Sequence, residues 1–330
     1  MPAPLALALA LWGYERATCT FVAGRENQVY HVKADDREFA LRLKRPGYRS
    51  EQELLSELQW LEAMDRAGLS VPRPQAALSG ALLETADGYY VDLIDWLPGK
   101  PLGRSRDPLQ LENTLSTFRA LGEEMAKLHL ACDAWETPDG FTRCLWDAEG
   151  LLGENPLWGR FWENPTLDTE TADLLETFRA VAADDLLQRS SSLDYGLIHA
   201  DLVRENVMLD GTSIRMIDFD DGGFGFRLFD VATALLKNMA EPNYQALKAA
   251  LIEGYRAYRM LDTSALDLFM ALRAVTYVGW IVPRMGEDGS PARNARFINH
   301  ARQLCTSYLE QKDKSEGDAH GQDHSCYRDI

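Results

Sequence analysis

Residues 198–219 read I-H-A-D-L-V-R-E-N-V-M-L-D-G-T-S-I-R-M-I-D-F, and this segment decides the interpretation of the chain. Asp201 lies two residues after His199, and Asn206 lies five residues after Asp201. Asp218 ends a short apolar run that predicts a strand. Phosphoryl-transfer enzymes use this spacing, because one aspartate accepts the proton of the attacking hydroxyl while an asparagine and a second aspartate hold metal ions.

The anionic nature of the transferred group explains this division of roles. Metal ions neutralise the phosphates, while one carboxylate stays clear of metal and orients the nucleophile. Taken singly, each residue has an ordinary explanation: a core histidine, a turn aspartate or an asparagine cap. Taken together, they predict a kinase of a hydroxyl group, with Asp201 as the catalytic base and with Asn206 and Asp218 as metal ligands.

Composition narrows the class of protein. The chain has 330 residues, 46% hydrophobic and 26% charged, as in an ordinary globular protein with room for two domains. The apolar run at residues 4–12 is too short for a membrane span and follows no Lys or Arg, so it favours an opening helix over a signal peptide. Five scattered cysteines without metal-ligand spacing predict reduced thiols and a cytoplasmic location.

The net charge of -17 argues against nucleic acid and against an anionic membrane surface as partners. Residues 131–194 hold fourteen Asp or Glu against four Arg. These carboxylates are either solvated helix faces or the lining of a cleft that attracts a cationic, amine-bearing substrate. Four tryptophans of the segment could box an alkylammonium or form the core of inserted helices, namely Trp135, Trp146, Trp158 and Trp162.

The first hundred residues predict a small β-rich lobe. Residues 28–33 and 38–44 are strand-like and joined by a polar turn. On the second strand Ala40, Arg42 and Lys44 share one face. A kinase places its phosphate-binding cation two residues after a small one on such a strand. Arg42 is therefore the candidate for the phosphate contact and Lys44 the alternative, unless both simply face solvent.

A helix is predicted at residues 51–67. Ser50 and Glu53 form a capping box at its start, which already accounts for Glu53. Glu57 lies one turn further along and is the candidate to pair with Arg42 and hold it toward the phosphates.

Strands at 77–84 and 89–96 lead into the Pro/Gly-rich stretch 97–103, which predicts the connection between two lobes. Adenine is expected to meet backbone groups just before it, at Asp95, Trp96 and Leu97. The turn 24–27 has one glycine, so it is either a loose phosphate cover or a plain hairpin turn. Beyond residue 107 amphipathic runs predict helices at 111–130, 175–187, 243–261 and 266–282. The expected organisation is an N-lobe at 1–97, a C-lobe at 98–310 and a disordered tail at 311–330.

Five sequence segments carry a family likeness. They read G-R-E-N-Q-V-Y, F-A-L-R-L-K-R-P-G-Y-R-S, S-E-L-Q-W-L, I-H-A-D-L-V-R-E-N-V and I-D-F-D-D-G-G-F-G-F-R-L-F-D-V-A, within residues 24–232. Through them the chain resembles the aminoglycoside phosphotransferase/choline kinase superfamily, above all its type II homoserine kinases and bacterial stress-response kinases. The resemblance implies an α+β, bilobal protein-kinase-like fold, ATP as the donor and Mg²⁺ as the metal.

The resemblance also implies residue roles. Asp201 corresponds to the base, and Asn206 with Asp218 to the metal ligands. Asp220 corresponds to a residue that supports the metal site, and His199 and Asp230 to structural braces of the catalytic loop. Arg42 stands where many relatives carry lysine, which puts the usual Lys–Glu pair in doubt.

The favoured function is ATP-dependent phosphorylation of a hydroxyl on a small amine-bearing metabolite or antibiotic, such as homoserine, choline or an aminoglycoside. The alternative is a Ser/Thr protein kinase of the stress-response type. Only eleven residues separate Asp218 from Asp230, too few for a long switchable segment. Retention of the three site residues argues against an inactive scaffold. Trp280, Arg284 and Arg293 either face the cleft, where an arginine could bind a substrate carboxylate, or lie on the surface. No pattern indicates an oligomeric state.

Overall fold

The computed structural model describes residues 3–24, 27–105 and 107–322, with the backbone alone for 315–322. The chain forms two compact units. The first comprises Met1–Arg143, Asp201–Gly222 and Ala240–Leu261, and the second comprises Cys144–Ala200, Gly223–Met239 and Asp262–Ile330. The N-terminal region is a β-sheet and the C-terminal region is helical, as predicted. The lobe boundary at Leu97 stays a prediction, since these units divide the chain elsewhere.

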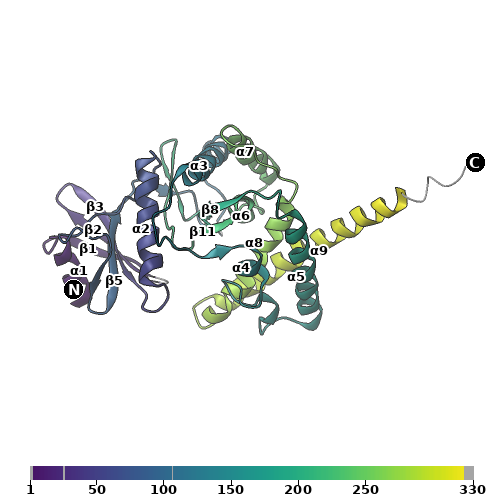
Figure 1. The fold of residues 1–330 in the computed structure, drawn as a ribbon, viewed down its shortest axis with the longest axis horizontal. Coiled ribbons are helices and arrows are strands. Elements are labelled where there is room, and N and C mark those ends of the chain that lie inside the picture. Colours follow the sequence, from purple (N-terminus) through teal and green to yellow (C-terminus); the bar gives the residue numbers. More distant parts are fainter. Residues whose placement is uncertain (1–2, 25–26, 106, 323–330) are drawn as a thin grey trace, which may run out of the picture. The chain divides into compact units, whose positions relative to one another are not determined.

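The first unit contains a five-stranded antiparallel sheet in the order β1-β2-β3-β5-β4 (Figure 1). Its strands are β1 (Thr18–Gly24), β2 (Asn27–Ala34), β3 (Arg37–Lys44), β4 (Glu84–Ala86) and β5 (Tyr89–Asp95). The strands predicted at 28–33 and 38–44 are confirmed. The strand predicted at 77–84 is wrong up to Glu84, because Gly80 takes a φ of +91° and closes a turn in which Ala77 N–H donates to the Ala81 carbonyl. The turn 24–27 includes residues 25–26, which lie outside the described residues.

The two faces of this sheet have different roles. On one face an apolar core forms under helix α1 (Ala3–Leu11), with Leu9 and Trp12 packed against Phe39 and Leu41. The other face carries Ala40, which clusters with Ile94 of β5 and Leu58 of helix α2. Because side chains alternate along a strand, Arg42 and Lys44 share the face of Ala40. The strand period therefore delivers two cations to the side where α2 lies.

Helix α2 (Glu51–Arg66) begins with the predicted capping box, in which Ser50 and Glu53 satisfy each other's backbone donors. Its buried residues include Ser56, Glu57 and Trp60. Two of these are polar, so this helix face must meet polar partners as well as an apolar core.

The remaining elements of the first unit are β6 (Lys100–Pro101), α3 (Thr114–Ala134), β9 (Val207–Asp210), β10 (Ser213–Met216) and α7 (Tyr244–Arg256). Helices α3 and α7 pack at very short range through two glycines. A Cβ atom at Gly122 would collide with the Leu251 carbonyl oxygen, and one at Gly254 with the Arg119 carbonyl oxygen.

The second unit holds β7 (Leu145–Trp146), α4 (Ala148–Leu152), η1 (Phe161–Glu163), α5 (Thr169–Arg189), β8 (Tyr195–Ile198), β11 (Gly223–Phe226), α6 (Arg227–Leu236), α8 (Leu266–Trp280), η2 (Val282–Arg284) and α9 (Ser290–Gln322). Helix α9 continues to Gln322, and the expectation of disorder from residue 311 stays a prediction. Lys312 of α9 donates to Asp185 of α5 at 2.7 Å. Residues 323–330 lie outside the described residues. Among the helices described, none combines the length and apolarity needed to cross a membrane.

The close approach of α3 and α7 gives a stability prediction. Gly122→Ala and Gly254→Ala should each lower the free energy of unfolding by about 2 kcal/mol or more, because neither backbone can yield without separating the helices. Urea unfolding measures the change. Gly286→Ala is the control, since Gly286 has negative φ and open space around its Cβ position. Wild-type midpoints for both variants would contradict the close packing.

Candidate active site

A short hairpin brings two of the predicted metal ligands together. Strands β9 and β10 pair in register from Asp210↔Ser213 to Val207↔Met216, around a tight turn in which Gly211 takes a φ of +62°. One step beyond the last pair, Ile217 N–H donates to the Asn206 carbonyl at 3.0 Å. Asp218 is the next residue. Asn206 and Asp218, which are twelve residues apart in the sequence, are therefore neighbours in space.

Asn206 also orients the predicted base. Its Nδ2 donates to Asp201 Oδ2 at 2.9 Å and to the Asp201 carbonyl at 3.0 Å. With the amide nitrogen turned to Asp201, the amide oxygen remains as an acceptor that can bind a cation. One side chain thus fixes the carboxylate of the predicted base and keeps an oxygen for the predicted metal.

The residues just before Asp201 are held by Asp230, as the resemblance implied. Backbone N–H groups of His199 and Ala200 donate to the Asp230 carboxylate at 2.9 and 2.6 Å. Ala200 takes a φ of +64°, a left-handed conformation that costs energy for a residue with a Cβ. Hydrogen bonds that these N–H groups donate to a charged, fully buried carboxylate offset that cost. His199 is itself buried, as expected of a brace.

Asp218 is strained and electrostatically crowded. Its φ is +66°. The surrounding protein displaces water from its carboxyl group, and together with the carboxylates of Asp220 and Asp201 this raises the pKa of Asp218 to about 7, although solvent still reaches the side chain. The same crowding raises the pKa of Asp221 to about 8. Carboxylates that repel one another in this way suit a bound cation.

A buried charge cluster links β3, α2 and β5. Arg42 donates to Glu57 at 2.8 Å, so the predicted pair is present. Two further bonds run from Arg42 Nε and Nη2 to the two oxygens of Asp92, at 2.7 and 3.0 Å. Burial alone would lower the pKa of Arg42, but its two carboxylate partners raise it well above the ordinary value. Arg42 and Glu57 are therefore both charged, and both are anchored.

Sequence reasoning missed Asp92. It has no exposed surface and stands in the apolar strand Y-Y-V-D-L-I-D. An aspartate inside a strand that is buried on both sides needs a cation, and that was the available signal.

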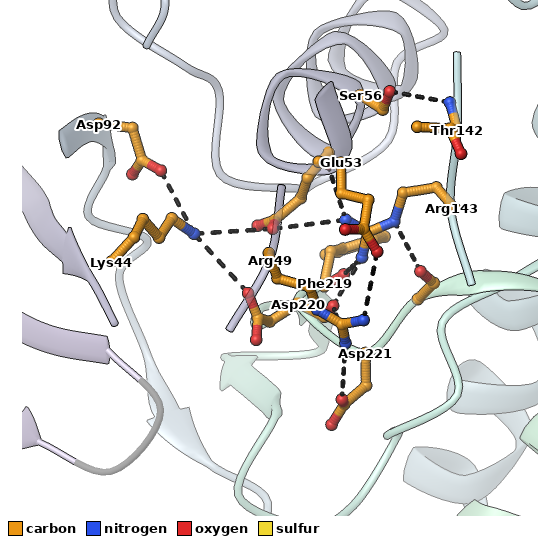
Figure 2. Close-up of polar contacts among 12 residues, drawn as sticks. Lys44, Arg49, Glu53, Ser56, Asp92, Thr142, Arg143, Phe219, Asp220 and Asp221 are labelled. Carbon is orange, nitrogen blue, oxygen red and sulfur yellow. Dashed lines mark hydrogen bonds and ion pairs between the residues drawn. The ribbon is translucent and has the colours of Figure 1, made fainter. Parts of the chain in front are cut away.

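Lys44 occupies the same cluster but is held differently. Its Nζ lies 3.3 Å from Asp92, 3.6 Å from Glu57 and 3.8 Å from Asp220 (Figure 2). Among the described residues this ammonium has no hydrogen-bond partner, and neither has Oδ2 of Asp220. Buried polar atoms of opposite charge that lack a hydrogen bond fit a site that receives a further charged group, such as a phosphate with its metal ion.

The three residues predicted to contact adenine lie at the end of β5. Asp95 N–H donates to the Arg73 carbonyl at 2.9 Å and Trp96 N–H to the Glu38 carbonyl at 3.1 Å. The Trp96 ring stacks on His31 with centroids 4.0 Å apart. None of the described residues accepts a hydrogen bond from Leu97 N–H. Of the three, Leu97 is the residue whose amide can donate to a base.

The tryptophans of the acidic segment are occupied by the protein itself. Arg273 lies over the Trp158 ring at 4.5 Å, and Arg179 lies over the Trp162 ring at 3.8 Å. Arg284 covers Trp280 at 4.2 Å, and Arg293 donates to Glu287 at 2.9 Å. Trp146 is buried against Phe229. Trp146 and Trp162 are buried, as the core interpretation expects, and Trp158 is partly buried; the alkylammonium box stays a prediction.

Part of the acidic excess is likewise structural. Asp147 and Asp168 cap α4 and α5, Glu154 pairs with Arg179, and Asp133 pairs with Arg259. Within 3–24, 27–105 and 107–322 no three His, Cys, Asp or Glu side chains converge as a ready-made metal site. Magnesium does not require one, since it is commonly bound by one or two carboxylates together with substrate phosphates.

Comparisons with known proteins agree with this geometry. The model of the phosphotransferase enzyme family matches residues 18–266. The chain is similar to an amicoumacin kinase of Bacillus subtilis, at 29% identity over 70% of this chain and 66% of the relative. It is also similar to a homoserine kinase of Xanthobacter autotrophicus, at 29% identity over 79% of this chain and 78% of the relative. Among solved structures, a microcompartment-associated aminopropanol kinase superposes with a TM-score of 0.81 and 27% identity, covering 92% of this chain and 96% of that one. The protein-kinase-like fold is thereby confirmed.

The buried cluster gives a prediction for stability. Glu57→Gln should lower the free energy of unfolding by about 3 kcal/mol, because it removes one charge from a set of buried ions. Chemical denaturation measures this change. Glu62→Gln on the same helix is the matched control, since its pair with Arg66 is exposed and should contribute no more than about 0.5 kcal/mol. Equal effects of the two variants would show that the Arg42–Glu57 pair is not buried in solution.

Proposed function

We propose that this chain phosphorylates the hydroxyl of an amine-bearing alcohol. The chain belongs to the phosphotransferase enzyme family and is therefore a small-molecule kinase that uses ATP. The observation that carries the proposal is the bond from Asn206 to Asp201 beside Asp218. This arrangement places the Asp201 carboxylate, which can accept a proton, beside Asn206 and Asp218, whose side-chain oxygens can bind a metal ion.

The residues would act as follows. Asp201 accepts the proton of the acceptor hydroxyl as the hydroxyl oxygen attacks the γ-phosphorus of ATP, while the bond from that phosphorus to the β–γ bridging oxygen breaks and ADP leaves. Asn206 Oδ1 and the Asp218 carboxylate would hold Mg²⁺, which supplies charge neutralisation of the phosphates when bound. In the left-handed conformation Asp218 sits among like charges, so a divalent cation relieves repulsion at that position.

Two cations of β3 are available for the phosphates. Arg42 has five N–H donors, of which three are used by Asp92 and Glu57. Two donors remain on a guanidinium whose position is fixed. Lys44 brings an ammonium that none of the described residues hydrogen-bonds. We assign the phosphate contact to Arg42, as predicted, with Lys44 beside it. Leu97 N–H is the proposed adenine contact.

The acceptor class follows from the relatives and from this chain's own side chains. Aminopropanol and homoserine, on which two of the relatives act by name, each combine an amine with a hydroxyl. Homoserine also has a carboxylate, which needs a cation. Arg293 is buried and donates to Glu287 and Ser290, and Arg284 covers Trp280, so both candidate arginines are engaged elsewhere. This favours an amino alcohol over an amino acid as the acceptor.

Turnover of the Asp201 variant tests the proposal. Asp201→Asn should lower kcat by roughly 10²–10⁴-fold, because the hydroxyl loses its proton acceptor, while ADP affinity stays within about threefold. Asp210→Asn is the matched control, as an aspartate of the same hairpin that pairs with Arg215 at the surface. ADP release is followed with amino alcohols, homoserine, choline, ethanolamine, aminoglycosides and a basic protein mixture as acceptors.

The acceptors separate the candidate functions. Turnover with a small amine-bearing alcohol that is lost in Asp201→Asn supports the proposal. Phosphate found on protein alone would replace it with the protein-kinase alternative. Near-normal turnover by Asp201→Asn would remove the base assignment.

A further inference from the structure

Arg143 is a buried arginine that no motif in the sequence singles out. Its side chain is 1% exposed. Figure 2 shows it between helix α2 and the segment that follows Asp218. Nε donates to the Gly222 carbonyl at 2.7 Å, and Nη2 donates to the carbonyls of Phe219 and Asp220 at 2.8 and 2.6 Å. Nη1 donates to the Glu53 carbonyl of α2 at 3.0 Å. One guanidinium therefore makes four hydrogen bonds to backbone oxygens.

Three of these acceptors belong to residues 219–222, directly after the strained Asp218. Carbonyls that converge on one point repel one another, and in a buried position they need a donor. A guanidinium presents its N–H groups as a planar fork, so it can satisfy several of them at once. A lysine, with one nitrogen, cannot reach the same set. This path of the chain therefore depends on the shape of the arginine as well as on its charge.

The other contacts of this region also run to α2. Thr142 N–H donates to Ser56 Oγ at 3.0 Å, which fixes the backbone from which Arg143 extends. Arg143 Nη1 lies 3.8 Å from Glu57 Oε2. Phe219 packs edge-on against Trp60 with centroids 5.0 Å apart, and a side chain at Gly222 would come within 2.5 Å of that indole. The segment 219–222 is thus attached to the helix that supplies Glu57.

We propose that Arg143 is a positioning residue that locks residues 218–222 to α2 and so holds Asp218 in its metal-binding conformation. The inference rests on the proposed function, since it assigns Asp218 to the metal. Protein kinases order the corresponding region by adding a phosphate that recruits arginines. In this chain Arg143 provides a permanent cation, and the eleven residues between Asp218 and Asp230 need no added charge.

Nucleotide binding with and without metal tests the proposal separately from turnover. ADP affinity is measured by calorimetry in Mg²⁺ and in EDTA for the wild type, Arg143→Met and Arg143→Lys. Loss of a group that orients a metal ligand typically weakens metal binding by about 10–100-fold. The factor by which Mg²⁺ raises ADP affinity should therefore be at least about tenfold smaller in Arg143→Met than in the wild type. The ADP affinity of this variant in EDTA should stay within about twofold of the wild type. Amide hydrogen exchange should accelerate at residues 219–222.

Controls distinguish positioning from general destabilisation. Arg66→Met, on an exposed arginine of α2, should leave every value unchanged. Free guanidinium ion should restore the metal effect in Arg143→Ala. If Arg143→Met does not fold, Arg143→Lys provides the test, because it keeps the positive charge but lacks the planar guanidinium. The gain in ADP affinity from Mg²⁺ should still be several-fold smaller in this variant than in the wild type.

The outcomes separate the two levels of the proposal. An unchanged metal effect in folded Arg143→Met or Arg143→Lys would overturn the role of Arg143 and leave the kinase function standing. If the wild type itself binds ADP without any response to Mg²⁺, the proposed metal site fails instead.

Discussion

Buried ions must have partners, and this requirement fixes the geometry around the proposed active site. Arg42, Lys44 and Arg143 are matched there by Glu57, Asp92 and Asp220, and none of the six residues is more than lightly exposed. Arg42 and Lys44 come from β3, and the other four residues come from four further parts of the first unit. Since an unpaired buried charge costs several kcal/mol, β3, α2, β5 and the segment after Asp218 can move only together. The cluster positions the site more than it stabilises the fold.

The sequence predicted the parts of this cluster that follow a period or a motif. Strand alternation placed Arg42 and Lys44 on one face, and the capping box of α2 left Glu57 as the partner of Arg42. The strand predicted just before Asp218 is present as β10, although its pairing with β9 was not predicted. Asp92 was missed although an acid in an apolar strand was a visible signal. Arg143 gave no signal, because its partners are backbone carbonyls, which every sequence has.

One other error has a physical cause. The run from Ala77 has the composition of a strand, but the left-handed Gly80 turns the chain there. In α9, Lys312 and Tyr308 bond to Asp185 and anchor the helix on α5. Burial alone would raise the pKa of Asp185, but these bonds and one from Arg189 lower it, so the carboxylate stays charged. Local composition does not reveal a partner more than a hundred residues away.

The left-handed Asp218 has a consequence for how such proteins diverge. Aspartate codons differ from glycine codons by a single base, and glycine adopts a φ of +66° without the steric cost that aspartate bears. One nucleotide change would therefore delete the proposed metal ligand and at the same time relax the backbone. Variants of this chain that bind nucleotide without turning it over are therefore one base change away. Selection for folding stability would not remove them.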